Sequence, residues 1–297
     1  MRQRRRNTAD IGVAINSNES QAIIESLNLI QAENMINSND VVVITPNWVK
    51  PVGPETGDVV GPESLRAIIR FVKQKNPRRI VVATGSAQRT TADIMKAVGY
   101  DKIINEEQVE FVDLNFGPFV RVNLNHSSPP ATNLNKLYQE MTFLISFAQL
   151  KIHSVATMTA AIKNIALGWP PAEEHGYPKK NLGIHDDVHG FISAMAQVIP
   201  IDLSIVSTNP AMIGTGPHNG IPCRAGIVIS GTDPVAVDTI GARLLGFHPE
   251  AIRYLWDLKN KNVGIADVNQ MNIKGMPVAD AERAFSMAAY GQAFTVE

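Results

Sequence analysis

Residues 151–164 carry the side chains best suited to chemistry, because polar groups interrupt an otherwise apolar stretch there. Lys151 and His153 come first, and Lys163 and Asn164 follow. Ammonium groups bind carboxylates and phosphates, and an imidazole titrates near neutrality and can pass protons to a substrate. The sequence therefore predicts Lys151, His153 and Lys163 as catalytic residues. His153 is the expected acid or base, with a pKa lowered by the neighbouring lysines.

The spacing of Thr159 and Lys163 predicts that both lie on one face of a helix over residues 157–167. Asn164 lies beside them, and Gly168 is suited to end the helix. We expect Thr159 and Asn164 to bind a ligand together with Lys163. A second interpretation, in which the lysines lie on the surface and the histidine in the core, stays open.

Asn47 and Lys50 follow a predicted strand over residues 41–45. In open α/β sheets, ligands bind outside the carboxyl ends of the strands, so we expect both side chains to contact a ligand. The alternative is a turn after Pro46 that Asn47 closes, with Lys50 in solvent.

Gly85, Ser86 and Arg89 follow another predicted strand and precede a predicted helix. Free amides at the start of a helix attract negative groups, so this loop is a candidate anion cradle. The alternative is a tight turn in which Thr90 or Thr91 caps the helix and Arg89 is solvated.

Three histidines, His175, His185 and His189, form a candidate metal site. On a helix, His185 and His189 would lie one turn apart, which suits the coordination of a divalent metal. Asp186 and Asp187 offer the alternative that they cap a helix while the histidines are solvated.

Two further ligand-binding candidates, Gly216 and Asp238, lie in the last third of the chain. Gly216 belongs to a glycine-rich turn over residues 214–220 that leads towards a strand, which does not fit a dinucleotide-binding loop but could close over a ligand. Asp238 lies in a helix that Asp233 and Pro234 are expected to start as cap and first residue.

Short apolar and β-branched runs alternate with helical patterns along the chain, as in a parallel sheet covered by helices. We predict a mainly parallel, Rossmann-like open α/β sheet with helices on both faces. The predicted strands are residues 11–15, 41–45, 80–84, 109–114, 143–150, 203–207 and 225–230. The predicted helices include residues 19–35, 63–75, 91–98 and 188–198.

The chain is expected to form one α/β domain over residues 10–297, preceded by a solvated basic tail over residues 1–9. Residues 170–184 are rich in Pro, Gly, Glu and Lys, which is typical of a long loop or small insertion. Residues 169–190 are therefore the expected lid or subdomain.

Composition excludes several classes of protein. The net charge of −1 lacks the basic excess of nucleic-acid-binding proteins, and no run of about 18 apolar residues could span a membrane. Cys223 is the only cysteine, so the chain forms no internal disulfide, and a cytoplasmic location is expected.

The ordered motifs resemble those of the domain of unknown function family numbered 362. That family combines a Lys-Pro-Asn-like element, Lys-x-His followed by Thr-x-x-x-Lys-Asn, a Gly-Pro turn and an Asp-Pro-x-x-x-Asp helix. The corresponding stretches are residues 45–47, 151–153, 159–164, 216–217 and 233–238. Some members carry ferredoxin-like iron–sulfur segments, whereas one cysteine cannot supply such a cluster here.

A fainter resemblance links residues 82–85 and the segment with Lys and His to the amino-terminal region of nickel-dependent lactate racemases. Those enzymes have a histidine soon after the glycine that corresponds to Gly85, where this chain has Ala87 and Gln88. The resemblance implies related architecture only.

Three functions stay open. The first is a protein that binds and transforms a small anionic molecule, with a carboxylate or phosphate, at the carboxyl ends of the strands. The second is a non-enzymatic binding or redox-accessory module that works with a protein partner and has lost the iron–sulfur segment of its relatives. The third is a histidine-based metalloenzyme with a divalent metal. The cofactor and a homo-oligomeric state are not fixed by the sequence.

Overall fold

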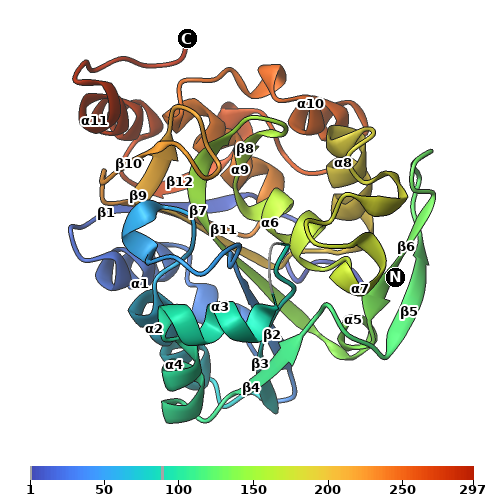
Figure 1. Ribbon diagram of the computed structural model, residues 1–297. Coiled ribbons are helices and arrows are strands. Elements are labelled where there is room, and N and C mark those ends of the chain that lie inside the picture. Colours follow the sequence, from blue (N-terminus) through green and yellow to red (C-terminus); the bar gives the residue numbers. More distant parts are fainter. Residues whose placement is uncertain (1, 88–89) are drawn as a thin grey trace.

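The computed structural model describes residues 2–87 and 90–297. They form a ten-stranded central sheet with helices packed on it (Figure 1). Two strands, β8 and β10, lie off its main path. In order across the sheet, the main strands are β12 (Asn272–Gly275), β1 (Asp10–Ile15), β11 (Ile227–Gly231), β9 (Leu203–Ile213), β7 (Phe143–His153), β2 (Val41–Pro46), β3 (Arg79–Thr84) and β4 (Glu110–Asp113).

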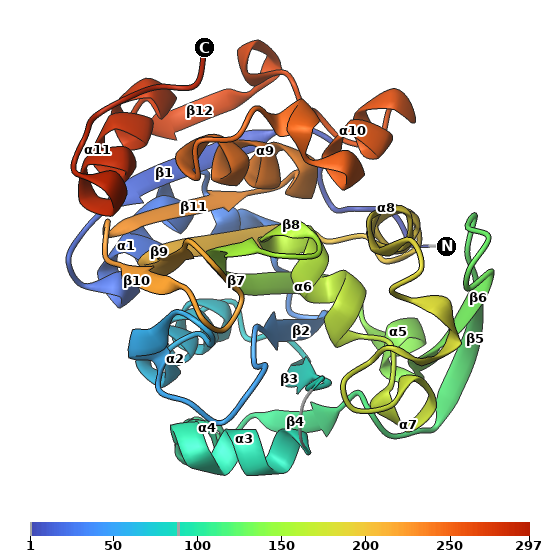
Figure 2. The same ribbon diagram turned by 45° about the horizontal axis from the view of Figure 1, so that its top comes forward.

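The sheet is largely parallel, which confirms the predicted Rossmann-like α/β class. Strands β9, β7, β2, β3 and β4 are parallel neighbours, as are β12 and β1. Strand β11 is antiparallel to both β1 and β9. Figure 2 shows β1 separated from β2 by β11, β9 and β7, so the first two strands of the chain are not neighbours.

Helices cover both faces of the sheet, and each face has its own apolar core. One core contains α1 (Glu19–Leu29), α2 (Pro62–Lys73) and α4 (Tyr100–Glu106), and the other contains α6 (Ala161–Gly168), α8 (Val188–Val198), α9 (Pro234–Leu244) and α10 (Arg253–Asn260). Helix α11 (Val278–Tyr290) packs on α9, and α3 (Thr91–Val98) contacts α4. Two-sided burial explains why β2, β7 and β9 have buried apolar residues on both faces, with buried polar residues between them.

Two of the central strands extend beyond the predicted ends, since each forms a hairpin there. The end of β7 pairs with β8 (Thr157–Thr159), and the end of β9 pairs with β10 (Ile221–Cys223). The predicted helix over residues 157–167 is therefore wrong in its first turn. Its first residues form a strand instead, and α6 begins only at Ala161.

The sequence patterns did not predict the hairpin of β5 (Phe119–Asn123) and β6 (Ala131–Asn135), which lies at the right edge of Figure 1. The short helix α5 (Leu137–Glu140) follows it. Residues 169–190 contain α7 (Ala172–His175) and the 3₁₀ turn η3 (Asn181–Gly183) before α8 begins. Further 3₁₀ turns are η1 (Ala32–Met35), η2 (Pro54–Thr56), η4 (Pro249–Ala251) and η5 (Val268–Gln270).

The basic amino-terminal segment is folded against the domain, which corrects the expectation of a solvated tail. Its arginines pair with aspartates from separate elements. The pairs are Arg2 with Asp202 at 2.5 Å, Arg4 with Asp233 at 2.9 Å, Arg5 with Asp40 at 2.7 Å and Arg6 with Asp10 at 3.5 Å. Charge complementarity to buried carboxylates holds the segment in place, and composition does not reveal such partners.

Among the residues that the structure describes, no helix has the length and apolar character needed to cross a membrane.

Candidate functional site

A cavity of about 550 Å³ opens at the carboxyl ends of β2, β3 and β7. Its walls come from those strand ends, from β8 and α6, from the segment before α8 and from the turn after β9. The described residues that line it include four lysines and three histidines but neither aspartate nor glutamate. They are Asn47, Trp48, Val49, Thr84, Gly85, Ala87, Lys151, His153, Ser154, Val155, Thr159, Lys163, Asn164, Leu167, Gly168, Pro178, Lys179, Lys180, His185, Val188, Pro217 and His218.

Lys151 is buried at the end of β7, where its ammonium group is held by neutral acceptors. Its Nζ donates to Oδ1 of Asn47 at 2.8 Å and to the carbonyl oxygen of Asp58 at 2.7 Å. Burial lowers its pKa to about 8, against the attraction of the Asp58 carboxylate. Lys151 and Asn47, which the sequence predicts separately as site residues, thus lie side by side at this edge of the sheet.

Lys163 lies on the first turn of α6, and its Nζ donates to Oγ1 of Thr159 at 3.2 Å. Thr159 reaches it from β8 rather than from the same helix, so the two residues meet for a different reason than predicted. Burial lowers the pKa of Lys163 to about 7, and the charge of Lys151 lowers it further. An appreciable fraction of Lys163 is therefore a neutral amine at neutral pH.

Lys179 is a third lysine of the cavity, buried like Lys151, and the sequence interpretation missed it. Its Nζ donates to the carbonyl oxygens of Gly85 at 2.8 Å, Leu167 at 3.0 Å and Gly168 at 3.4 Å. Two of these carbonyls end α6, where an ammonium group complements the helix dipole. Burial lowers the pKa of Lys179 to about 7. A Pro-Lys-Lys sequence in a loop gives no sign of burial.

None of these three ammonium groups forms an ion pair with a carboxylate in the part of the chain that the structure describes. Taking a charge out of water costs several kcal/mol unless an opposite charge or full hydrogen bonding compensates it. Lys151, Lys163 and Lys179 are compensated by carbonyl, amide and hydroxyl oxygens alone. Such a site stabilises any anion that enters it.

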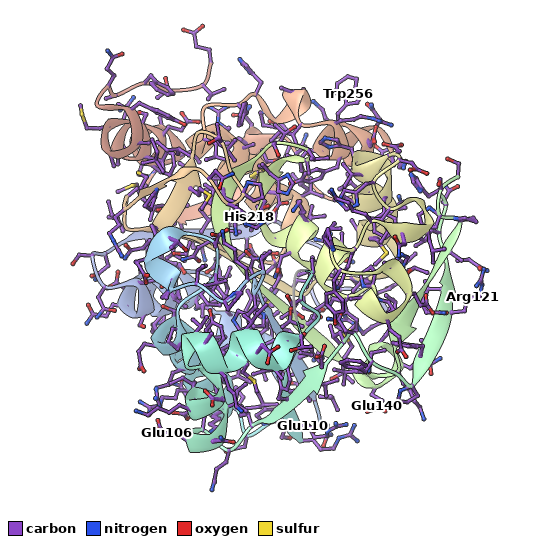
Figure 3. All side chains as sticks on the ribbon, viewed as in Figure 1. Glu106, Glu110, Arg121, Glu140, His218 and Trp256 are labelled. Carbon is purple, nitrogen blue, oxygen red and sulfur yellow. The ribbon has the colours of Figure 1, made fainter. Side chains whose placement is uncertain are left out.

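The nearest carboxylate, that of Asp58, is already used by other cations. Its side chain pairs with Nζ of Lys50 at 2.9 Å and with Nδ1 of His218 at 2.8 Å. Although burial opposes it, the hydrogen bonds from His218 and Lys50 lower the pKa of Asp58. Lys50, which the sequence predicts to bind a ligand, lies outside the lining and pairs with Asp58 instead. His218 is labelled near the centre of Figure 3.

His153 is held in one tautomer by the backbone that follows it. Its Nδ1 accepts hydrogen bonds from the amides of Val155 and Ala156, both at 3.1 Å, so the proton of the neutral ring lies on Nε2. Burial, together with Lys163 and Lys151, holds the pKa of His153 well below its ordinary value. The ring is therefore neutral at physiological pH and has a hydrogen-bond donor at Nε2, and its role as an acid or base stays a prediction.

Two amides of the loop after β3, those of Gly85 and Ser86, already have hydrogen-bond acceptors within the protein. The amide of Gly85 donates to the carbonyl of Gly168 at 3.0 Å, and the amide of Ser86 donates to Oγ1 of Thr91 at 3.1 Å. Thr90 caps α3, as the alternative interpretation stated. Gly85 lines the cavity and Ser86 does not, and Arg89 lies outside the described residues.

Asn164 lines the cavity beside Lys163, but its amide nitrogen donates hydrogen bonds to the strands under α6. Its Nδ2 donates to the carbonyl oxygen of Thr45 at 2.8 Å and to Oγ of Ser146 at 3.1 Å. These bonds tie α6 to β2 and β7. Asn164 therefore fixes the helix that carries Lys163.

Gly216 and Asp238, the two candidates from the last third of the chain, have structural positions outside the lining. A Cβ on Gly216 would lie 2.0 Å from the carbonyl oxygen of Ile152, so the turn packs directly on β7. Asp238 accepts from the amides of Ala161 and Ile162 at 2.8 and 3.2 Å and thereby holds the start of α6. Burial raises the pKa of Asp238 to about 7, opposed by these bonds.

The three histidines of the predicted metal site have separate environments. No group of three or more His, Cys, Asp or Glu side chains could hold a metal ion within residues 2–87 and 90–297. The ring of His175 contacts Thr132 and Asn181 through both nitrogens. His185 precedes the helix that contains His189, so their expected one-turn spacing does not exist.

Asp187 ends the helical spacing expected between His185 and His189, because α8 begins directly after it. Its side chain accepts from the amide of Gly190 at 3.1 Å and caps α8, as the alternative interpretation stated. His185 is left on the preceding turn, where it lines the cavity and where burial lowers its pKa, with further contributions from Lys180 and Lys163.

Comparison with protein families gives a match over most of the chain. The family described as "Domain of unknown function (DUF362)" matches residues 42–243. A thylakoid-associated protein of Synechocystis sp. is 24% identical over 225 residues, which are 74% of this chain and 67% of that protein.

Among solved structures, the lactate racemase apoprotein from Thermoanaerobacterium thermosaccharolyticum is similar to this chain. The identity is 15% and the TM-score 0.48, over 77% of this chain and 56% of that protein. This chain thus spans little more than half of that structure. Similarity at this level supports no inference about chemistry.

Proposed function

This chain belongs to the DUF362 family, and because that membership assigns no reaction, we propose from the cavity itself that the protein binds a small molecule with a carboxylate or phosphate group. The observation that carries the proposal is the charge of the lining. Four lysines and three histidines line the cavity, and no acidic side chain among the described residues does.

The proposal gives each polar residue a role. Lys151 and Lys163 bind the anionic group, since each has neutral partners and can donate further hydrogen bonds. His153 donates from Nε2 to a ligand oxygen. A bound anion offsets the free-energy cost of taking the ammonium groups out of water, and the ammonium groups in turn attract the anion.

The apolar part of the lining receives the rest of the ligand. Trp48, Val49, Val155, Leu167 and Val188 lie on the walls. A cavity of about 550 Å³ lies within the range of sites that enclose a whole metabolite rather than a bare ion. The ligand is therefore an organic acid or an organic phosphate.

The second candidate function is that of an accessory module. The name of the cyanobacterial relative states an association with thylakoids, which favours a role beside a partner. This candidate predicts a stable protein partner in pull-downs and no dependence of that complex on Lys163. The expected cytoplasmic location rests on the single cysteine alone.

Thermal unfolding tests anion binding directly. At pH 7 and constant ionic strength, sulfate, phosphate and citrate are compared with chloride. A ligand at 100 times its Kd stabilises the folded state by about 2.7 kcal/mol, which corresponds to a rise in Tm of roughly 5 °C. Lys163→Met should remove most of this rise, and Lys136→Met, an exposed lysine outside the lining, should retain it. Equal shifts in both variants would refute the proposal.

A further inference from the structure

We infer that Lys163 forms an imine with the keto group of a 2-oxo acid that has an apolar side chain. This inference rests on the proposed function, since the same cavity must first bind the carboxylate. It adds a covalent step and a substrate class to simple anion binding.

Of the three lysines, the half-buried Lys163 has the fewest hydrogen-bond partners among the residues that the structure describes. Lys179 donates to three carbonyl oxygens, which uses every proton of its ammonium group, and Lys151 donates to two oxygens. Within residues 2–87 and 90–297, Lys163 donates only to Oγ1 of Thr159. Its nitrogen is therefore the one among the three that can lose a proton and attack a carbon at the smallest cost in hydrogen bonds.

The surroundings of Lys163 favour the neutral amine that such an attack requires. An amine becomes nucleophilic when it is desolvated or lies beside another cation. Lys163 has both conditions, since it lies with Lys151 in one cavity whose described lining has no carboxylate. A carboxylate partner would hold the proton on the nitrogen, and none is paired with it among residues 2–87 and 90–297.

Other groups of the cavity remain available for the carboxylate of the substrate. Lys151 has a third proton on Nζ, His153 has a proton on Nε2, and Lys180 is exposed at the edge of the lining. A 2-oxo acid has its carboxylate on the carbon next to the keto group. One molecule can therefore contact these donors while Lys163 reaches its carbonyl carbon.

The cavity is larger than the polar part of such a substrate. Apolar walls formed by Trp48, Leu167 and Val188 suit a hydrocarbon chain or ring beyond the keto group. The substrate class is thus a 2-oxo acid with an apolar side chain, for which phenylpyruvate is a suitable probe.

The chemical step balances without a cofactor. The neutral amine of Lys163 forms a C–N bond to the carbonyl carbon, and the C–O bond then breaks. The departing oxygen leaves as water with one proton from the amine and one from solvent, and a protonated imine remains. The positive charge stays on the nitrogen, where it assists later loss of a proton from the carbon next to the imine carbon, because the electron pair left there moves into the C=N bond and gives an enamine.

Reductive trapping tests the inference. The folded protein is incubated at pH 7 with phenylpyruvate and cyanoborohydride, and the product is analysed by intact mass and peptide mapping. We expect one adduct per chain, located on Lys163. Lys163→Arg, which retains the charge, should lose the adduct, and Lys136→Arg should retain it. Thr159→Val, which removes the oxygen that positions the amine, should slow trapping several-fold without a comparable loss of phenyllactate binding.

Phenyllactate separates this inference from the proposed function, because it has the same carboxylate and ring but no keto group. Stabilisation by phenyllactate without any adduct from phenylpyruvate would overturn the imine and leave anion binding intact. Absence of both would overturn both. Adducts spread over surface lysines and unchanged in Lys163→Arg would also overturn the imine. Peptide mapping of the wild-type protein shows such a distribution even if the variant does not fold.

Discussion

The affinity of the cavity for an anion of fixed charge should fall steeply between pH 6 and pH 9. Sulfate is the suitable probe because its own charge is constant over this range. Lys163 has a pKa of about 7, so nearly every molecule has the ammonium form at pH 6 and about one in a hundred has it at pH 9. If sulfate binds the ammonium form, its Kd rises about 100-fold, or about 2.7 kcal/mol.

Isothermal titration calorimetry with sulfate at pH 6, 7, 8 and 9 measures this change. Other cationic side chains also line the cavity, so the wild-type protein is compared with Lys163→Met. The variant should bind more weakly at pH 6 and lose about one proton of the pH dependence. A Kd that is constant with pH, or an identical slope in the variant, would refute the assignment of Lys163 as a ligand-binding cation.

The sign of the effect on stability follows from the same shift. Because the pKa of Lys163 is lower in the folded protein than its ordinary value of 10.5, the unfolded chain binds more protons between about pH 7 and 10.5. This group therefore makes the ligand-free protein less stable at pH 7 than at pH 10. Sulfate should reduce that difference, since it stabilises the ammonium form of the folded protein.

Two further predictions concern the supports of the site. Asp238→Asn replaces one carboxylate oxygen with an amide group that donates a hydrogen bond. This group would face another donor, either an amide at the start of α6 or the hydroxyl of Tyr254. The free energy of unfolding in urea should therefore fall by about 1–3 kcal/mol. A fall below about 0.5 kcal/mol would contradict this role. Gly216→Ala places a Cβ 2.0 Å from the carbonyl of Ile152 and should lower stability by about 1–3 kcal/mol, whereas Gly168→Ala, whose Cβ meets side-chain atoms at 3.7 Å, should lower it less. Equal Tm values for the two glycine variants would count against the close packing of the turn.

The location of the site was largely predictable from the sequence. Parallel strands bring their carboxyl ends to one edge, so apolar runs followed by Asn47, Gly85 and Lys151 were enough to expect these residues together. Strands with two buried faces give a strong signal because apolar residues occupy successive positions rather than alternate ones. Lys163 was predicted from a helical spacing with Thr159, and the two residues meet although Thr159 lies on β8.

What the sequence did not reveal depends on contacts between distant segments. Lys179 is buried only because residues 169–190 fold over the end of α6, and the loop sequence is that of a solvated turn. The strand β8 was missed because Thr157–Thr159 fits a helical pattern as well as a short hairpin strand, and pairing with β7 decides between them. The tautomer of His153 is fixed because two backbone amides donate to Nδ1, which residue types alone do not show.

The central claim is that the ammonium groups of this cavity hold an anion, and a crystal structure with selenate at pH 6 tests it most directly. The account predicts an anomalous peak inside the cavity, within hydrogen-bonding distance of Nζ of Lys151 and Lys163, that disappears in crystals of Lys163→Met. A cavity without a peak, in crystals that bind selenate elsewhere on the surface, would contradict it.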